Sequence, residues 1–184
     1  MIIAREKLHS NIAEYILYMW QIEDIIRSMN FSQQRIMDEV VDRFEQPPSV
    51  KGEMMNWYAG LIRMMKEEGT EQRGHLVFLQ HKVNELNDFH RLILLSPRQH
   101  EYQLLYRNAK PAIDALFERS GANGENNEIE TCLTGLYGLL MLKLQKKEIS
   151  AETTESMKAI SLLLAKLAEF YKKYEKGELD LETI

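Results

Sequence analysis

The chain has 184 residues, of which 45% are hydrophobic and 28% are charged. This composition predicts one globular domain over residues 1–184 and excludes global disorder. The net charge of −5 argues against a nucleic-acid partner and against docking on an anionic membrane, since both need a basic surface. The longest uncharged apolar segment, 131–142, is shorter than the roughly 20 residues of a transmembrane helix. With no secretory signal visible, the cytoplasm is the expected location.

Apolar residues recur at alternating three- and four-residue steps along almost the whole chain, which predicts an all-α fold. The first predicted helix spans about 3–28 and carries a wide apolar face, formed by Leu8, Ile12, Tyr15, Met19, Ile22 and Ile26. The second is predicted to follow Asn30, with Gln33 as a box-like cap. It must end before Pro47 and Pro48, which forbid further helix.

The next two helices are predicted on either side of Gly69, which suits the end of the third helix. Ser49 is the expected cap of the third helix, and its apolar face is expected to be Val50, Met54, Trp57, Leu61 and Met64. The fourth helix is predicted from Thr70 to near Leu95. Its stripe contains Leu76, Leu79, Val83, Leu86, His90 and Ile93.

The fifth helix is predicted to begin at Pro97 with Ser96 as its cap. Pro111 lies inside this pattern, lacks a backbone N–H and crowds the preceding turn. The sequence therefore predicts either a kink or a break there and does not distinguish them. The polar stretch 121–127 is predicted to be a loop.

Two further helices are predicted over about 128–147 and, after the Ser150 cap, 151–176. The first of them is apolar nearly all round, which predicts a place in the middle of a bundle. Its Gly135 and Gly138 lie on roughly the same side, where they would let a neighbouring backbone approach closely. The acidic tail 177–184 is expected to fray. Together these elements predict a compact antiparallel bundle of about six or seven helices.

Histidines and carboxylates give the polar candidates for a site. His81, Glu85 and Asp88 share one face of the fourth helix at a spacing that suits metal ligands. That face is opposite the apolar stripe, so the simpler interpretation is a solvated surface. His90 falls on the stripe itself, which favours a core histidine with hydrogen-bonded nitrogens over a ligand or acid–base role.

Two more acidic positions leave alternatives open. Glu6 and His9 form one Glu-x-x-His pair, whereas a di-iron bundle needs two, so no metal is predicted. Glu23 either pairs with Arg27 or is a buried carboxylate that lines a pocket.

Cys132, the single cysteine, is expected to be a buried core residue. No phosphate, dinucleotide or nucleophile motif is present, so no cofactor is predicted and an enzyme is disfavoured.

The third predicted helix is rich in methionine and aromatic residues, which can form an adaptable apolar groove. The residues proposed to bind a partner are Met54, Met55, Trp57, Tyr58, Ile62 and Met65. An exposed groove would need Met55, Tyr58 and Ile62 at the surface. The alternative is that this helix completes the core.

The opening segment 3–24, IAREKLHSNIAEYILYMWQIED, resembles the start of an uncharacterised family of Bacteroidetes proteins of similar length. The resemblance implies a small, cytosolic, all-helical protein and a domain of unknown function. It implies no activity and carries over no functional residues.

These observations favour a non-enzymatic interaction protein that acts by self-association or by binding a protein partner. Trp20 and Trp57 would serve as anchors, because binding energy concentrates in such side chains. The competing interpretation is a small-molecule- or metal-binding bundle, conceivably an enzyme. It would use His90 or Glu23 in a pocket between helices.

Overall fold

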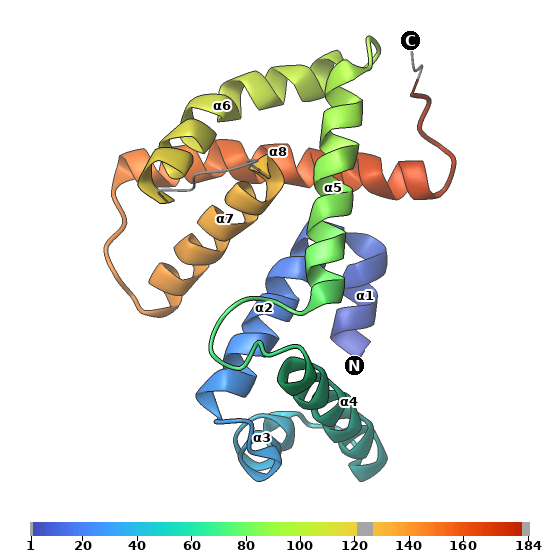
Figure 1. Cartoon of the computed structure of the whole chain (residues 1–184), viewed down its shortest axis with the longest axis vertical. Coiled ribbons are helices and arrows are strands. Elements are labelled where there is room, and N and C mark those ends of the chain that lie inside the picture. Colours follow the sequence, from blue (N-terminus) through green and yellow to red (C-terminus); the bar gives the residue numbers. More distant parts are fainter. Residues whose placement is uncertain (1, 121–126, 182–184) are drawn as a thin grey trace. The chain divides into compact units, whose positions relative to one another are not determined.

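The computed structural model describes residues 2–120 and 127–181. Within these ranges it contains eight α-helices, one 3₁₀-helix and no strand, which confirms the predicted all-α class (Figure 1). The elements are α1 (Ile2–Ser10), α2 (Ile12–Ser28), α3 (Gln33–Glu39), η1 (Val41–Arg43), α4 (Pro48–Glu67), α5 (Val77–Leu95), α6 (His100–Ser120), α7 (Glu128–Leu144) and α8 (Ala151–Glu175). None of these helices has the length and apolar character needed to cross a membrane.

The chain divides into two compact units. Unit 1 comprises Met1–His9 and Glu14–His81, and unit 2 comprises Ser10–Ala13 and Lys82–Ile184. Helices α3 and α4 lie wholly in unit 1, and α6, α7 and α8 lie wholly in unit 2. The single domain expected from the sequence stays a prediction.

The first predicted helix is interrupted at Asn11, so the expected span 3–28 is wrong at that point. Serine and asparagine side chains compete for backbone hydrogen bonds, and asparagine is a favoured residue at a helix start. The apolar periodicity continues across the break, which is why it was not visible in the pattern. Most of the expected face is buried, including Ile12, Met19 and Ile26.

The starts of α3 and α4 differ from the sequence-based prediction. Ser32, and not Gln33, caps α3, where its Oγ accepts a hydrogen bond from the Arg35 N–H at 3.3 Å. Helix α4 begins at Pro48 with no side-chain cap, so the role expected for Ser49 is wrong. A proline at the first helical position needs no partner for a backbone N–H, because it has none.

The C-terminal end of α4 agrees with prediction. Gly69 has φ +68, and the Thr70 N–H donates to the Met65 carbonyl at 2.9 Å. This pair of features is the Schellman motif, in which glycine adopts the left-handed conformation without a steric cost.

The fourth predicted helix begins seven residues later than expected, at Val77 instead of Thr70. Residues 70–76 form a loop in which Gly74 has φ +84. Tertiary hydrogen bonds, described below, hold this loop, and a helical periodicity cannot report them. From there on the predicted stripe is buried throughout, at Leu76, Leu79, Val83, Leu86, His90 and Ile93.

In unit 2, α6 starts at His100, so the predicted start at Pro97 is wrong. The Ser96 hydroxyl is buried and has no hydrogen-bond partner among the described residues, so it does not act as the expected cap. The Gln103 side chain donates to the carbonyls of Leu94 and Ser96 at 3.1 and 3.0 Å and closes the corner. Helix α6 continues through Pro111, so the predicted break does not occur.

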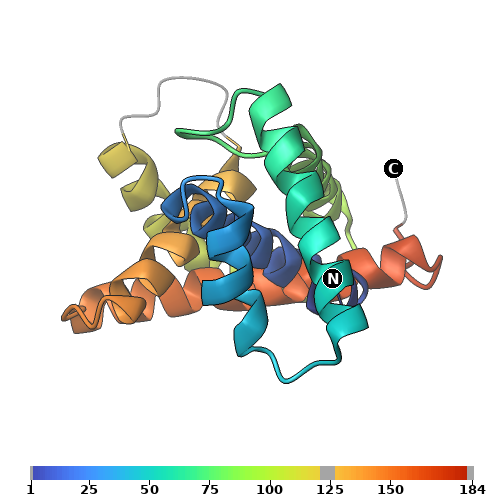
Figure 2. The same cartoon turned by 90° about the horizontal axis from the view of Figure 1, so that it is seen from below.

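Helices α6, α7 and α8 pack against one another, and α7 runs at an angle to α8 (Figures 1 and 2). Asn127 caps α7 by accepting the Glu130 N–H at 2.9 Å. The Ser150 cap of α8 is confirmed, with the Thr153 N–H donating to its Oγ at 3.1 Å. Gly177, at φ +70, follows the end of α8 as expected.

Two sequence-based predictions fall partly outside the described residues. Most of the expected loop 121–127 lies there, as does the tip of the expected frayed tail, 182–184. Within the described part of the tail, Asp180 forms an ion pair with Arg98. Fraying of the tail stays a prediction.

Candidate functional site

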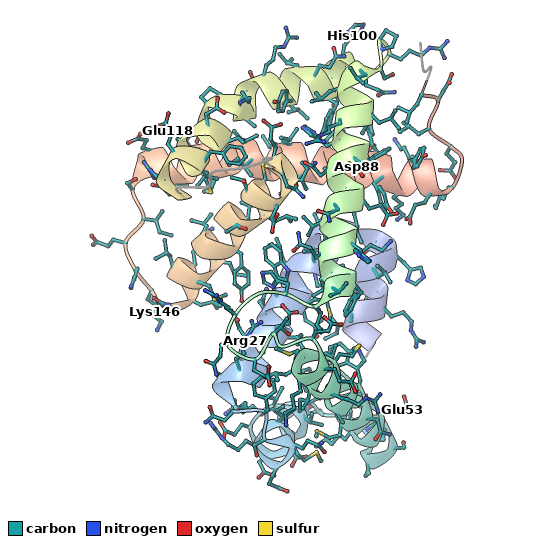
Figure 3. All side chains as sticks on the ribbon, viewed as in Figure 1. Arg27, Glu53, Asp88, His100, Glu118 and Lys146 are labelled. Atoms are coloured by element: carbon teal, nitrogen blue, oxygen red, sulfur yellow. The ribbon has the colours of Figure 1, made fainter. Side chains whose placement is uncertain are left out.

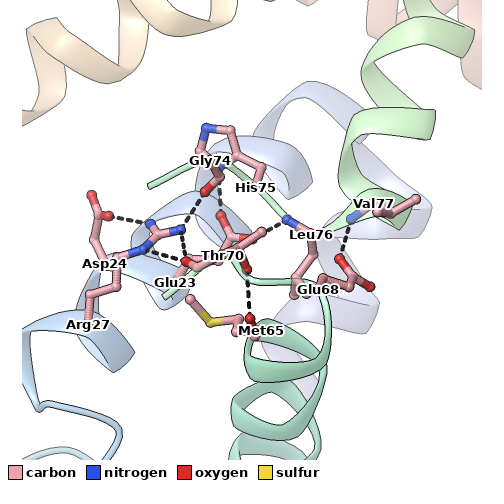
Figure 4. Close-up of polar contacts among 10 residues, drawn as sticks. All are labelled: Glu23, Asp24, Arg27, Met65, Glu68, Thr70, Gly74, His75, Leu76 and Val77. Atoms are coloured by element: carbon pink, nitrogen blue, oxygen red, sulfur yellow. Dashed lines mark hydrogen bonds and ion pairs between the residues drawn. The ribbon is translucent and has the colours of Figure 1, made fainter. Parts of the chain in front are cut away.

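A buried carboxylate organises the polar core of unit 1. Glu23 is fully buried. One carboxylate oxygen accepts the Leu76 N–H at 2.8 Å, and the other lies 2.6 Å from His75 Nδ1 (Figure 4). The expected Glu23–Arg27 ion pair is therefore wrong. Glu23 is a buried carboxylate, as the alternative prediction stated. The pocket that it was expected to line stays a prediction.

Arg27 holds the same loop from the other side. Its guanidinium donates to the Thr70 carbonyl at 3.1 and 3.2 Å and also to the Gly74 carbonyl (Figure 4). It pairs in addition with Asp24 at 2.8 Å. The guanidinium therefore ties the loop 70–76 to α2 through three hydrogen bonds to backbone carbonyls.

His75 is the functional-type residue that sequence reasoning missed. It stacks on Trp20, with the ring centroids 4.2 Å apart, and it remains 27% exposed at the side chain. Its Nε2 makes no hydrogen bond with another described residue. A carboxylate on one ring nitrogen orients the other as a ligand or base. Only the position of His75 just before the apolar stripe could have drawn attention to it.

A second polar network lies in unit 2 around His90. This residue is 1% exposed, with Tyr102 Oη 2.6 Å from its Nδ1 and a Glu128 oxygen 3.3 Å from its Nε2. The Tyr102 hydroxyl can donate to Nδ1 while the Nε2–H donates to Glu128. Both ring nitrogens are occupied, which is the geometry of a hydrogen-bonded core histidine.

Glu128 links this network to the surface. It also accepts from the Tyr106 hydroxyl at 3.0 and 3.1 Å, and Lys110 Nζ lies 3.6 Å away. The hydrogen bond from His90 holds the pKa of the Glu128 carboxyl below its ordinary value, against the effect of partial burial. Burial raises the pKa of the Tyr106 hydroxyl, so this group stays a donor.

Helix α7 buries little of its apolar surface. Only Ile129, Cys132 and Leu133 are buried among its residues. The remaining large apolar side chains are half-buried at Leu136, Tyr137, Leu139, Leu140, Met141 and Leu142, and Leu144 is 64% exposed. The expectation that this helix lies in the middle of a bundle is therefore wrong.

The two glycines of α7 differ in their surroundings. A Cβ at Gly135 would lie 2.7 Å from Leu116 Cδ1 on α6, so close packing explains this glycine as expected. A Cβ at Gly138 would meet nothing within 4 Å, and the residue is exposed. The packing explanation therefore fails for Gly138.

The family model described as Domain of unknown function (DUF4924) matches residues 1–178. The chain belongs to this family. No curated protein and no solved structure matches the chain. The description of the DUF4924 family names no activity, so its members supply no functional residues to compare with the sites above.

In this DUF4924 chain the predicted metal-type face of α5 is exposed at His81, Glu85 and Asp88. Glu85 accepts from Lys82 at 2.8 Å and from the Tyr171 hydroxyl at 2.6 Å. Within 2–120 and 127–181, no three histidine, cysteine or acidic side chains converge as metal ligands. A binding role for this face stays a prediction.

The other candidate reactive residues are Glu6, His9 and Cys132, and their surroundings are typical of structural residues. Glu6 is exposed, and the His9 ring lies 2.6 Å from the Arg5 carbonyl. Cys132 is fully buried, and burial raises the pKa of its thiol to about 12. Because the thiolate is the reactive form, this cysteine is chemically inert in the folded chain.

The predicted partner-binding residues of α4 are mostly core residues. Met54, Tyr58, Ile62 and Met65 are buried, whereas Met55 and Trp57 are half-buried. The exposed groove that required Tyr58 and Ile62 at the surface is therefore wrong. The sequence pattern predicts the buried face about one residue too early, because both sides of this helix carry apolar residues.

Proposed function

We propose that this chain is a non-enzymatic interaction protein that acts as a self-associated dimer through the exposed side of α7. The observation that supports this proposal is the mismatch between the composition of α7 and its burial. The stretch 131–142 contains no charged residue, yet Cys132 and Leu133 are its only buried side chains.

The physical argument is the cost of leaving this surface in water. Covering apolar area stabilises an association by roughly 25 cal/mol per Å², and contiguous apolar surface on a folded chain marks interaction sites. The surface defined here as the α7 face consists of Thr134, Gly138, Met141 and Leu142, which recur at helical spacing. The polar cluster around His90 is a competing candidate. Both ring nitrogens of His90 already have hydrogen-bond partners, so this cluster favours a ligand less.

The proposal keeps the expected setting of the chain. A protein partner in the cytoplasm, instead of a nucleic acid or a membrane, suits the net charge of −5. We also propose a Bacteroidetes source, which the resemblance of the N-terminal segment suggests.

Sedimentation velocity on the full chain over a wide concentration range tests the proposal. The wild type is expected to form a dimer, and Thr134→Glu to remain a monomer with an unchanged helical spectrum, because this exposed position lies on the α7 face. Ser161→Glu is the matched control, since Ser161 is an exposed small polar residue on α8. A wild type that is monomeric at every concentration would contradict the proposal.

A second candidate function is supported by His75 alone. Its carboxylate-oriented ring and uncommitted nitrogen could bind a small molecule or a metal ion. Titration of the full chain with Zn²⁺, using His75→Gln as the comparison, tests this function. Binding that the variant loses would support it, and equal binding by both proteins would refute it.

A further inference from the structure

We propose that His75 is a site of covalent modification, at which Nε2 accepts a phosphoryl group from a small acyl phosphate. This proposal is independent of association through α7, and it narrows the second candidate function of His75 to one chemical class. The residues that support it lie in unit 1. They provide an oriented ring, an uncommitted ring nitrogen, a buried counter-charge and no second ligand for a metal.

The His75 ring is held in one orientation by two neighbours. Glu23 lies 2.6 Å from Nδ1, and the Trp20 ring stacks on the imidazole with an interplanar angle of 13°. The backbone just before the ring is fixed as well, because Arg27 donates to the Gly74 carbonyl (Figure 4). A ring fixed in this way presents its second nitrogen to a reagent with little further loss of rotamer freedom.

The Nε2 atom of His75 has the electron pair that a nucleophile needs. A carboxylate accepts hydrogen bonds, so the contact with Glu23 places the proton on Nδ1 and leaves the lone pair on Nε2. The side chain is 27% exposed, and Nε2 has no hydrogen-bond partner in the described part of the chain. His75 therefore combines partial exposure with an uncommitted ring nitrogen.

Glu23 supplies the counter-charge that a modified ring requires. A fully buried carboxylate is costly unless a cation pairs with it. The guanidinium of Arg27 does not fill this role, because it donates to the Thr70 and Gly74 carbonyls and pairs with Asp24. A bond from Nε2 to an electrophile makes the ring cationic, and the ring then pairs with Glu23 across the existing contact.

The surroundings of Nε2 favour a group held by one covalent bond over a metal ion. Zinc sites use three or four protein ligands, whereas no three histidine, cysteine or acidic side chains converge within 2–120 and 127–181. A phosphoryl group needs only one nucleophilic atom. Arg73, an exposed cation two positions before His75, favours an anionic phosphoryl group over a neutral acyl group.

The modification is a displacement at phosphorus. The Nε2 electron pair forms the N–P bond while the bond from phosphorus to the acyl oxygen breaks, and a carboxylate leaves with that electron pair. The Nδ1 proton stays between the ring and Glu23, which acts as a positioning residue because it contacts the ring and not the phosphoryl group. Water later cleaves the N–P bond, releases inorganic phosphate and restores the histidine.

Site-resolved phosphorylation of the full chain by acetyl phosphate tests the proposal. Peptide mass spectrometry at mildly alkaline pH, where N-phosphorylated histidine survives, measures the initial rate at each histidine. His75 is expected to react about tenfold faster than His81 and His100, two exposed histidines whose rings no described carboxylate orients (Figure 3 labels His100). Equal rates at the three histidines, or an acyl group on His75 in place of phosphoryl, overturn the proposal.

Glu23→Gln and Glu68→Gln form a matched pair of variants. Both replace a carboxylate that accepts a backbone N–H, from Leu76 and Val77 respectively, but of the two only Glu23 bonds the ring. Glu23→Gln is expected to lower the rate at His75 by about tenfold and to leave the other histidines unchanged, whereas Glu68→Gln leaves all rates unchanged. An equal loss in both variants overturns the proposal, because loosening of the loop would then explain it.

The comparison of the three histidines in the wild type decides the outcome even where a variant fails to fold. A chain that binds Zn²⁺ through His75 but takes up no phosphoryl group overturns this inference and leaves the second candidate function standing. The oligomeric state of the chain bears on neither result.

Discussion

Replacing the two glycines of α7 by alanine gives a matched test of how the fold uses them. In an exposed helix interior, Gly→Ala raises the free energy of unfolding by about 0.5–1 kcal/mol, because alanine loses less backbone entropy on folding. At Gly138 nothing opposes this gain, since a Cβ there meets open space. We therefore expect Gly138→Ala to be more stable than the wild type by about that amount.

At Gly135 the same gain is opposed by a steric clash. The new Cβ would lie 2.7 Å from Leu116 Cδ1 and 3.6 Å from Met157 Sδ, so the leucine must move. Overpacking costs typically about 1–3 kcal/mol, and the low end applies because Leu116 is half-buried and its terminal methyl can rotate away. With a clash of about 1 kcal/mol against a gain of about 0.5–1 kcal/mol, the net effect of Gly135→Ala is a loss of about 0–0.5 kcal/mol.

Urea denaturation followed by far-UV circular dichroism measures both variants, at protein concentrations low enough that association does not contribute. A Leu116→Ala background provides the control. It removes the clashing methyl, so Gly135→Ala should there become as favourable as Gly138→Ala. Equal stabilities of the two glycine variants in the wild-type background would refute the argument, because one site is crowded and the other is open.

Three further predictions concern caps and buried charges. Glu23→Gln should lower the free energy of unfolding by about 2 kcal/mol, because a charge-assisted hydrogen bond from the Leu76 N–H is lost. Hydrogen exchange at the Leu76 amide should also increase. Unchanged exchange would contradict the anchoring role of Glu23. The pKa of Glu128 lies below its ordinary 4.5 in the folded chain, so its contribution to stability is present above that value and is lost as the pH falls through the lowered pKa. Glu128→Gln should therefore flatten the stability profile below about pH 4.5, and an unchanged acid profile would count against the network. Lys146→Gly should stabilise the chain by about 1 kcal/mol, because Lys146 has φ +55, whereas Lys147→Gly should not; similar effects of the two would sink the strain argument.

The periodic pattern predicted the elements best where packing alone decides them. The stripe from Leu76 to Ile93 was assigned residue by residue, and the Ser150 cap and the glycine ends at Gly69 and Gly177 were also correct. In each case the signal is local, because a helix face and its caps depend on residues only a few positions apart. The same local rules failed at Ser96, whose hydroxyl is buried without a partner while Gln103 bonds the corner.

The candidate sites could not be predicted in the same way because their residues come from distant segments. Glu23 meets Leu76 across 53 positions, and His90 meets Glu128 across 38. Periodicity places Glu23 only at the edge of an apolar arc, which favours an ion pair with Arg27 over a buried carboxylate. His75 carries no pattern of its own, since its role depends on a loop that the sequence predicts to be helix.

The incorrect prediction of a central position for α7 has a physical explanation. An apolar helix with no charge between Glu130 and Lys143 should be covered on all sides, yet against the described residues only Ile129, Cys132 and Leu133 of α7 are buried. A second molecule could supply the missing cover, because burial of apolar side chains in a dimer satisfies the same requirement as burial in a core.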